Sequence, residues 1–484
     1  MSTLYTKLLD TARCGSVFVW CILFACISHP LHGADFSITP AISIQEVFTD
    51  NVTLRPSQFK EEDFITEVTP AITMGLETAR SNTQLDYSLQ NLLYANDSDR
   101  NDLFHLLQVN TTGELLSDRV FLDFSLNRST QNVGNSGNTA VDNFSISGDR
   151  ANVLTYKITP SWQQRIGKLA EFTASYSRDD VSSSRLQGSS ADDVKVALSS
   201  GTAFNQLLWD VKFHSRFVTN DTGRTTRVRN ILAKSRYLLS RKLAIFAEAG
   251  YDNNRFASNS GDVGGFRWKL GGEWNISQRT GIEAGYGRRF FGDDLLLRIF
   301  TRTKRGRITL AYSKKPSTTR ALLFEQQVFN FTDQFGDPVL DPVSERVADI
   351  NVNVPVQTDE LLIRSRLKTD IGYRLRKHSL GFSGIYEEVD YQLTRDTEFT
   401  RRADAYWTWS FFPNTRSTLT IGWSKQNLRI GNDDRYISAQ LRVSHNLRED
   451  LIGSIGTRYI DRDSNLDFRK FKEFRLFANL NKEF

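Results

Sequence analysis

The last stretch of the chain, FKEFRLFANLNKEF at residues 471–484, alternates apolar and polar side chains almost to its end. Every second residue from Phe474 to Leu480 is apolar, the residues between them are mostly polar, and only Lys482 breaks the pattern. Successive side chains of a β-strand point to opposite faces, so this pattern predicts a strand with one apolar face. The strand then ends on an aromatic residue, Phe484.

The same alternation returns after residue 35, for example at residues 208–217, 242–252, 265–276 and 402–412. Such stretches span about 10–15 residues, whereas strands of globular sheets most often have about 5–6. Longer polar loops are predicted at residues 51–63, 132–143, 182–193, 255–265 and 429–436. Tight turns alternate with them, at residues 79–82, 116–119, 165–168, 201–206, 239–242, 277–280, 304–307, 374–378, 413–416 and 447–450.

Short connections at one end of the strands and long ones at the other are typical of outer-membrane barrels. Ten tight turns connect twenty strands, and a first strand from about Phe36 and a last one ending at Phe484 add two. We therefore predict an all-β fold: a transmembrane antiparallel β-barrel of about 22 strands, within a range of 18–22. Its apolar face would contact lipid and lipopolysaccharide in the outer membrane of a Gram-negative bacterium.

The aromatic end at Phe484 resembles the signal that such barrels present to the barrel-assembly machinery, so Phe484 is the predicted assembly signal.

Residues 1–34 are predicted to be a signal peptide, with the barrel over residues 35–484. Lys7 and Arg13 precede an apolar run from Gly15 to Ser28, which is too short to span a membrane. A short buried helix and a lipoprotein signal with lipidated Cys26 are the alternatives. Removal of this segment also removes Cys14, Cys21 and Cys26, which are all the cysteines of the chain. The remainder could form no disulfide and no cysteine-ligated metal site.

Aromatic residues make up 12% of the chain and fit the interfacial girdles of a membrane barrel. Core aromatics of a soluble sheet are the alternative. The predicted outward-facing tryptophans are Trp209, Trp268, Trp274, Trp407, Trp409 and Trp423. A long extracellular loop is predicted over residues 315–359, and it could fold inward, cover the mouth, or move freely at the surface.

No catalytic motif is present: the sequence lacks a phosphate-binding loop, HExxH and GxSxG. Asp210 and His214 share one face of a strand, but Ser215 points to the other face, so these residues cannot form a triad. The net charge of +5 is too small to suggest nucleic-acid binding. We therefore predict no enzyme and no cofactor.

Paired aspartates recur at residues 179–180, 192–193, 293–294 and 433–434. Such pairs could bind Ca²⁺ or Mg²⁺, but solvated loop acids are the simpler interpretation, so no metal site is predicted.

Basic residues dominate the predicted inward face of the middle strands, and inward Phe246, Tyr406 and Tyr436 could stack on sugars. Arginine and lysine lining a pore favour anions. A ladder of ion pairs that stiffens a closed barrel explains the same residues equally well. The predicted pore-lining basic residues are Lys212, Arg216, Lys234, Arg236, Arg267, Lys269, Arg298, Arg364, Arg366 and Lys368.

Three stretches resemble a family of outer-membrane β-barrels associated with PEP-CTERM/exosortase systems and exopolysaccharide loci. They are FSITPAISIQEVFTDNVTL, FITEVTPAITMGLET and TQLDYSLQNLLYAND, and the later DPVLDPVSERV and LGFSGIYEEVDYQ look like the same family. The resemblance implies a barrel in a polysaccharide or surface-protein export system, with export-system proteins as partners and no catalytic residues.

The leading hypothesis is therefore a barrel that helps to export an anionic polysaccharide or another polyanion, with residues 315–359 as its gate. An outer-membrane enzyme with its site in the extracellular loops, around Asp433 and Asp434, and a structural surface barrel are the alternatives.

Overall fold

The computed structural model describes residues 34–132, 142–146, 150–185, 187–256, 262–321, 360–429 and 431–484. All of the predicted signal peptide except Ala34, and most of the predicted loop over 315–359, therefore lie outside the described residues. Among the described residues, no helix is long and apolar enough to cross a membrane.

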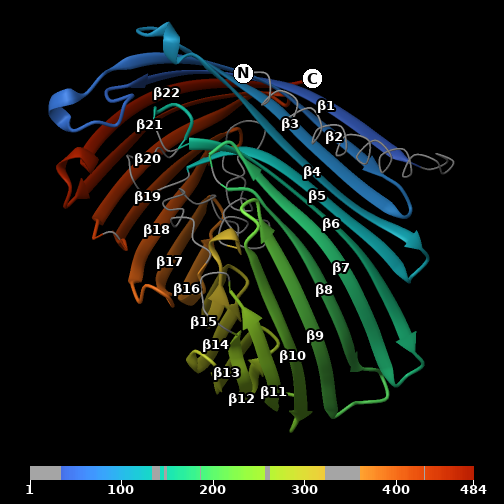
Figure 1. The fold of residues 1–484 in the computed structure, drawn as a ribbon. Helices are drawn as coiled ribbons and strands as arrows, with labels where there is room; N and C mark the ends of the chain where they lie inside the picture. The colour runs from blue at the N-terminus through green and yellow to red at the C-terminus, as the bar shows by residue number, and fades with distance from the viewer. Residues whose placement is uncertain are drawn as a thin grey trace, which may run out of the picture.

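Twenty-two antiparallel strands form one continuous wall (Figure 1). They are β1 (Asp35–Thr49), β2 (Asp63–Glu77), β3 (Ser81–Tyr94), β4 (Asp102–Leu116), β5 (Val120–Asn132), β6 (Arg150–Ile166), β7 (Ala170–Ser183), β8 (Ser189–Ser200), β9 (Leu207–Asn220), β10 (Thr225–Leu238), β11 (Leu243–Arg255), β12 (Asp262–Ser277), β13 (Thr280–Arg289), β14 (Gly292–Arg302), β15 (Gly306–Ser317), β16 (Leu362–Arg374), β17 (His378–Tyr391), β18 (Thr397–Phe412), β19 (Thr415–Asn427), β20 (Asp433–Arg448), β21 (Leu451–Ser464) and β22 (Phe471–Glu483). Short 3₁₀ turns lie at η1 (Ser57–Phe59), η2 (Ser98–Arg100) and η3 (Asp467–Arg469).

Each strand pairs with the next along the chain, and β22 pairs with β1 to close the ring. The closing register runs from Ala41 opposite Glu483 to Thr49 opposite Arg475. The backbone hydrogen bonds of the sheet therefore continue across the seam, as lipid requires. The predicted fold, including 22 strands, is confirmed.

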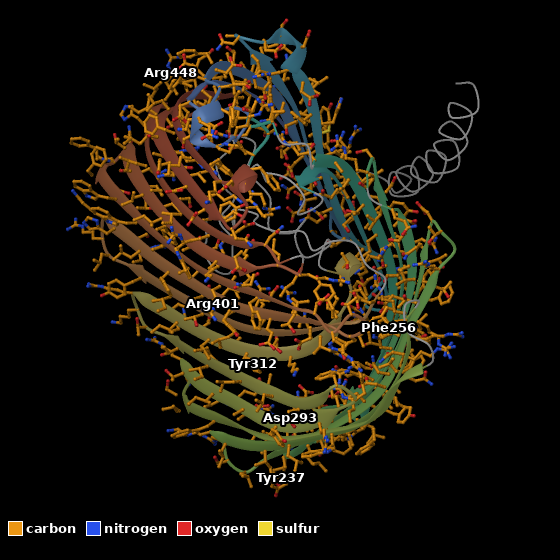
Figure 2. The ribbon with its side chains drawn as sticks, turned by 60° about the vertical axis from the view of Figure 1, so that its left-hand side comes forward. Tyr237, Phe256, Asp293, Tyr312, Arg401 and Arg448 are labelled. Atoms are coloured by element: carbon orange, nitrogen blue, oxygen red, sulfur yellow. The ribbon has the colours of Figure 1, made fainter. Side chains whose placement is uncertain are left out.

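The exposed face of the sheet is apolar and the interior face is polar, which is the opposite of the arrangement in a soluble protein. On β22, Phe474, Leu476 and Leu480 are exposed, whereas Glu473, Arg475 and Asn479 on the other face are buried. Side chains project from both faces (Figure 2). The six predicted tryptophans occupy outward positions, and all but Trp209 are among the exposed large apolar residues. Trp407 and Trp409 stack with ring centroids 6.2 Å apart.

All ten predicted tight turns join strands at one end of the barrel, the end at which β1 begins and β22 finishes. Several loops at the other end are shorter than predicted. Strand pairing covers parts of the predicted loops 182–193, 255–265 and 429–436, because β8, β12 and β20 begin at Ser189, Asp262 and Asp433. Likewise, β15 continues to Ser317, beyond the predicted loop start at residue 315. Backbone pairing continues to these strand ends, for example between Val181 of β7 and Ser189 of β8.

Deletion of Phe484 is expected to reduce the amount of folded barrel in the outer membrane. The Phe484 backbone N–H donates to the Pro40 carbonyl at the seam, 2.9 Å away, and its ring is exposed on the lipid side. Loss of the hydrogen bond alone would cost about 1 kcal/mol of stability. Heat-dependent gel mobility of outer-membrane fractions measures the effect, and Phe484→Trp, which keeps an aromatic end, serves as control. Equal amounts of the deletion variant and wild type would refute the assignment of Phe484.

Candidate functional site

The predicted pore-lining basic residues all occupy positions on the interior face, and each lies within 4.0 Å of a carboxylate. Across neighbouring strands, Lys234 pairs with Glu248 at 3.4 Å and Arg364 with Glu387 at 2.7 Å. The other pairs are Lys212–Asp210, Arg216–Asp193, Arg236–Glu273, Arg267–Glu248, Lys269–Asp294, Arg298–Glu283, Arg366–Glu387 and Lys368–Asp370. The interior of the middle strands is therefore a network of ion pairs.

These cations differ strongly in their access to the lumen. The side chains of Lys212 and Arg298 are 56% and 65% exposed. In contrast, Lys269 and Arg364 are buried against the wall. An ion inside the lumen would contact Lys212 and Arg298 but not Lys269 and Arg364. Sequence alternation gives the face of a residue but not its accessibility, so it could not separate them.

An acidic wall lies on the other side of the ring and was not predicted. The interior positions of β1–β5 carry no lysine or arginine. Their interior carboxylates are Asp35, Asp63, Glu67, Glu77, Asp86, Asp102, Glu114 and Asp123. We call the interior face of β1–β5 the acidic wall and the interior face of β9–β16 the basic wall. β3 lies half-way round the ring from β14, so the two walls face each other across the lumen. A list of inward acids, strand by strand, would have revealed this asymmetry from the sequence.

Residues 142–146, from the connection between β5 and β6, lie inside the barrel near the long-loop end. Phe144 packs in a buried apolar cluster with interior residues of β1–β4 and β22, among them Val47, Ile65 and Phe477. The Tyr94 hydroxyl donates to the Phe144 carbonyl at 2.9 Å. This segment therefore occupies part of the lumen beside the β1–β22 seam.

Asp142 anchors this segment to the wall. Its carboxylate accepts from Arg475 at 2.5 Å and from Arg458 at 2.8 Å, and Arg475 also donates to Glu473. Burial alone would raise the pKa of the Asp142 carboxyl, but the guanidinium groups of Arg475 and Arg458 outweigh burial and hold this pKa well below its usual range.

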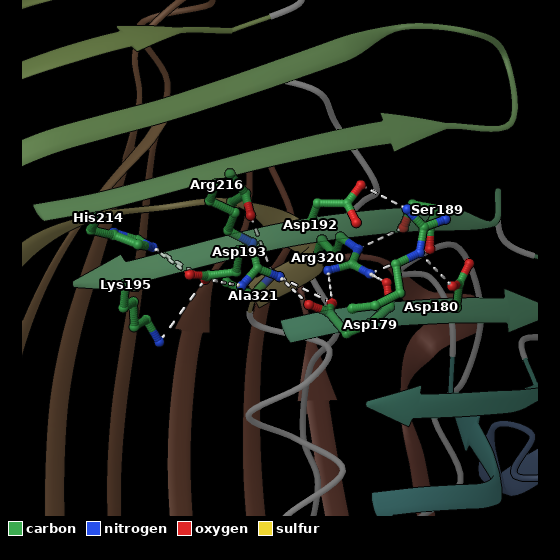
Figure 3. Close-up of polar contacts among 12 residues, drawn as sticks. Asp179, Asp180, Ser189, Asp192, Asp193, Lys195, His214, Arg216, Arg320 and Ala321 are labelled. Atoms are coloured by element: carbon green, nitrogen blue, oxygen red, sulfur yellow. Dashed lines mark hydrogen bonds and ion pairs between the residues drawn. The ribbon is translucent and has the colours of Figure 1, made fainter. Parts of the chain in front are cut away.

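Residues 318–321 form a second inserted segment, directly after β15. Arg320 donates to the Asp179 carboxylate and, at 2.7 Å, to the Ser189 hydroxyl (Figure 3). Asp179 and Ser189 belong to β7 and β8, which are not neighbours of β15, so this segment reaches another part of the wall. Arg216 bridges Asp179 and Asp193, which extends the cluster.

The other described end of this connection is also held inward. Leu361 packs with Phe256 and with Phe290 and Phe291 in an apolar cluster. The Glu360 carboxylate accepts from Arg429 at 2.9 Å. Inward folding was one of the alternatives for the predicted loop, whose residues 322–359 lie outside the described residues.

The paired aspartates do not form carboxylate clusters, because the two members of a pair point to opposite faces. The interior members Asp179, Asp193, Asp294 and Asp434 are buried and pair with cations. Of the outward members, Asp180, Asp192 and Asp293 accept from tyrosine hydroxyls. Within the described ranges, no group of three or more histidine, cysteine or acidic residues could hold a metal ion.

The enzyme-like candidates are also separated. His214 contacts Asp193 at 3.1 Å and Asn230, whereas Ser215 accepts from Arg229 on the outward face. The proposed stacking surface on Phe246 is wrong, because this ring is buried beneath Lys234, whose Nζ lies 4.5 Å from the ring centre. A Cβ on Gly271 would lie 2.3 Å from the same ring, so the opposite side is filled too. Tyr436 is similarly covered by Arg462.

Comparison with solved structures identifies barrels of similar fold. The FrpB iron transporter from Neisseria meningitidis superposes with a TM-score of 0.54 and 7% identity, over 92% of this chain and 82% of that one. The siderophore receptor PirA from Acinetobacter baumannii gives 0.51 and 8%, over 92% and 80%. A ferric enterobactin receptor from Pseudomonas aeruginosa, solved with enterobactin, gives 0.51 and 9%, over 94% and 82%. This chain is an outer-membrane β-barrel.

At these identities the likeness concerns the fold alone. No family model and no curated protein matches the chain. The similar barrels are described as receptors and a transporter.

Asp434→Ala is expected to lower the free energy of unfolding by about 3–5 kcal/mol. The Asp434 carboxylate accepts at 2.7 Å from both Arg462 and Arg469, and all three side chains are buried, so the substitution removes the anion that two buried cations share. Urea unfolding in detergent micelles measures the change. Asp433→Ala, at the exposed neighbour, should stay within about 0.5 kcal/mol of wild type. Equal effects of the two substitutions would contradict this account.

Asp142→Asn is expected to loosen segment 142–146 and to increase channel opening, because the amide cannot replace the charge that Arg475 and Arg458 bind. Single-channel recording in planar bilayers measures the open fraction. Asp99→Asn, at an exposed acid of the neighbouring β3–β4 connection, is the control and should conduct like wild type.

The same anchor sets a pH dependence. A carboxyl whose pKa is lowered on folding contributes stability above its unfolded pKa, and this stability is lost as pH falls through the folded value. The wild-type open fraction should therefore stay constant from neutral pH to about pH 4 and rise only in stronger acid. A rise centred between pH 5 and 7 would assign the gating to another group.

Proposed function

We propose that this chain is an outer-membrane transport barrel that its own extracellular segments close at rest, and that its cargo is an anionic polymer such as an exopolysaccharide. The observation that carries the proposal is the docking of two inserted segments on interior charges, Asp142 on Arg475 and Arg320 on Asp179. A structural surface barrel would not need interior residues that hold loops through exchangeable ion pairs.

The basic wall supplies the interaction with cargo. On β9–β16 the interior lysines and arginines outnumber the interior acids, although many are already paired. A passing anion can take the place of a neighbouring carboxylate, so the exposed cations Lys212 and Arg298 would exchange partners as the polymer moves. The acidic wall of β1–β5 would repel the polymer and keep it against the basic side. Resemblance to the exopolysaccharide-associated barrels supports the same cargo.

Uptake of a ferric chelate is a second candidate, which the fold shared with FrpB and PirA favours. Single-channel recording of residues 34–484 separates the two. Reversible block by a polyanionic saccharide, such as polygalacturonate, would support the first candidate, whereas block by ferric enterobactin alone would support the second. A folded barrel that neither conducts nor binds either compound would overturn both.

The combined substitution Lys212→Glu and Arg298→Glu is expected to convert an anion-preferring pore into a cation-preferring one, because both side chains face the open lumen. Reversal potentials in asymmetric KCl measure the change. Reversal of the buried Lys269 and Arg364 should instead impair refolding, since each would bury like charges beside Asp294 and Glu387. Unchanged ion selectivity in the variant with Lys212→Glu and Arg298→Glu would show that the basic wall does not determine selectivity.

A further inference from the structure

Four short turns carry an exposed cluster of cations, which we call the basic rim. These turns join β10 to β11, β12 to β13, β14 to β15 and β16 to β17. The basic rim consists of Arg241, Lys242, Arg279, Lys304, Arg305, Arg376 and Lys377, and all seven side chains are exposed. The four turn sequences, residues 239–242, 277–280, 302–307 and 374–378, contain no aspartate or glutamate. The rim is therefore a surface of a single sign of charge.

The basic rim differs from the lumen in charge compensation. All the predicted pore-lining cations have carboxylate neighbours, but none of the seven rim residues forms an ion pair with a described carboxylate. The turn cations therefore lack the carboxylate neighbours that the predicted pore-lining cations have.

Backbone hydrogen bonds hold the turns side by side. The Lys242 carbonyl accepts from Asn275 N at 2.7 Å, and the Arg279 carbonyl accepts from Arg302 N at 2.8 Å. The Arg305 carbonyl accepts from Arg374 N at 2.6 Å in the same way. Four successive hairpins therefore present their cations along one fixed edge.

The rim lies at the edge of the lipid-facing surface. Exposed outward residues such as Leu243, Trp274, Ile308 and Tyr373 lie within a few residues of the turn tips. At about 3.3 Å per strand residue, the cations are within roughly 15 Å of these side chains. Trp274 and Tyr373 also belong to the residue types that favour the headgroup region. Long basic side chains at this distance from the apolar surface can reach the phosphates of lipid headgroups.

The remaining short turns carry fewer cations without an acidic neighbour. Arg119 follows Asp118, Arg448 is followed by Glu449 and Asp450, and residues 201–206 carry no charge. Residues 165–168 carry Arg165 and Lys168, but Arg165 pairs with Glu171. The basic rim is thus the longest run of such turns around the barrel.

We propose that the basic rim binds the phosphate groups of anionic phospholipids in the periplasmic leaflet. Lysine and arginine just outside the apolar band attract an anionic lipid surface, and each effective contact adds to the preference. One side of the barrel would collect a patch of anionic lipid, whatever the cargo of the lumen. The site needs no change in the fold, because the turns are already held in place.

Native mass spectrometry of the refolded barrel, with phosphatidylglycerol and phosphatidylcholine in equal amounts, tests the proposal. The rim variant combines Arg279→Gln, Lys304→Gln, Arg305→Gln and Arg376→Gln. The matched control combines Arg80→Gln, Arg119→Gln, Lys168→Gln and Arg448→Gln, which are exposed cations on the other short turns. Wild type and control should retain phosphatidylglycerol preferentially, and the rim variant should lose this preference by about fivefold or more.

An undiminished preference in the rim variant would overturn the proposal. So would a rim variant that keeps phosphatidylglycerol but loses binding of polygalacturonate in lipid-free micelles, because the rim would then be a docking site for the polymer. If the fourfold variant does not show the heat-dependent mobility of a folded barrel, the pair Lys304→Gln and Arg305→Gln, confined to one turn tip, gives the same comparison against Arg80→Gln and Arg119→Gln.

Discussion

Closure of the sheet between β1 and β22 is the constraint on which the rest of the molecule depends. Lipid offers no partner for a backbone N–H or C=O, so an open edge would leave a whole strand of polar groups unpaired. The seam also preserves the alternation of faces, because Val47 lies opposite Phe477 and both are interior. Every interior side chain of the 22 strands therefore shares one enclosed volume. The charge pattern of the lumen is a consequence of this ring.

Within that volume, geometry decides which charges are neutralised. Directly opposed interior residues on neighbouring strands lie about 5 Å apart, so Lys234 meets Glu248 and Arg364 comes within reach of Glu387. A turn tip has no opposing strand beyond it, so the exposed side chains of Lys304 and Arg305 point to the solvent and the headgroups without a carboxylate partner among the described residues. The same strands can thus carry paired cations in the interior and unpaired cations on the turns.

Alternation with period two was sufficient to predict the strands, the ten tight turns and the interior face of residues such as Lys212 and Arg298. It could equally have shown that Asp179 and Asp180 point to opposite faces. Alternation could not predict contacts between distant segments. Arg320 lies 141 residues from Asp179 along the chain, and Asp142 lies 333 residues from Arg475. No periodicity encodes which interior charge a loop residue will meet. Alternation also could not predict burial, since Lys269 and Lys212 both occupy interior positions of alternating strands but differ in their access to the lumen.

The two inserted segments differ in what their release leaves behind. When Arg320 departs, Asp179 keeps its contact with Arg216, so the wall retains a paired carboxylate. When segment 142–146 departs, Arg475 keeps Glu473, but Arg458 loses its only carboxylate within ion-pair distance among the described residues. Phe144 would also leave its apolar cluster. Release of residues 318–321 from β7 and β8 is therefore expected to cost less than release of residues 142–146 beside the seam.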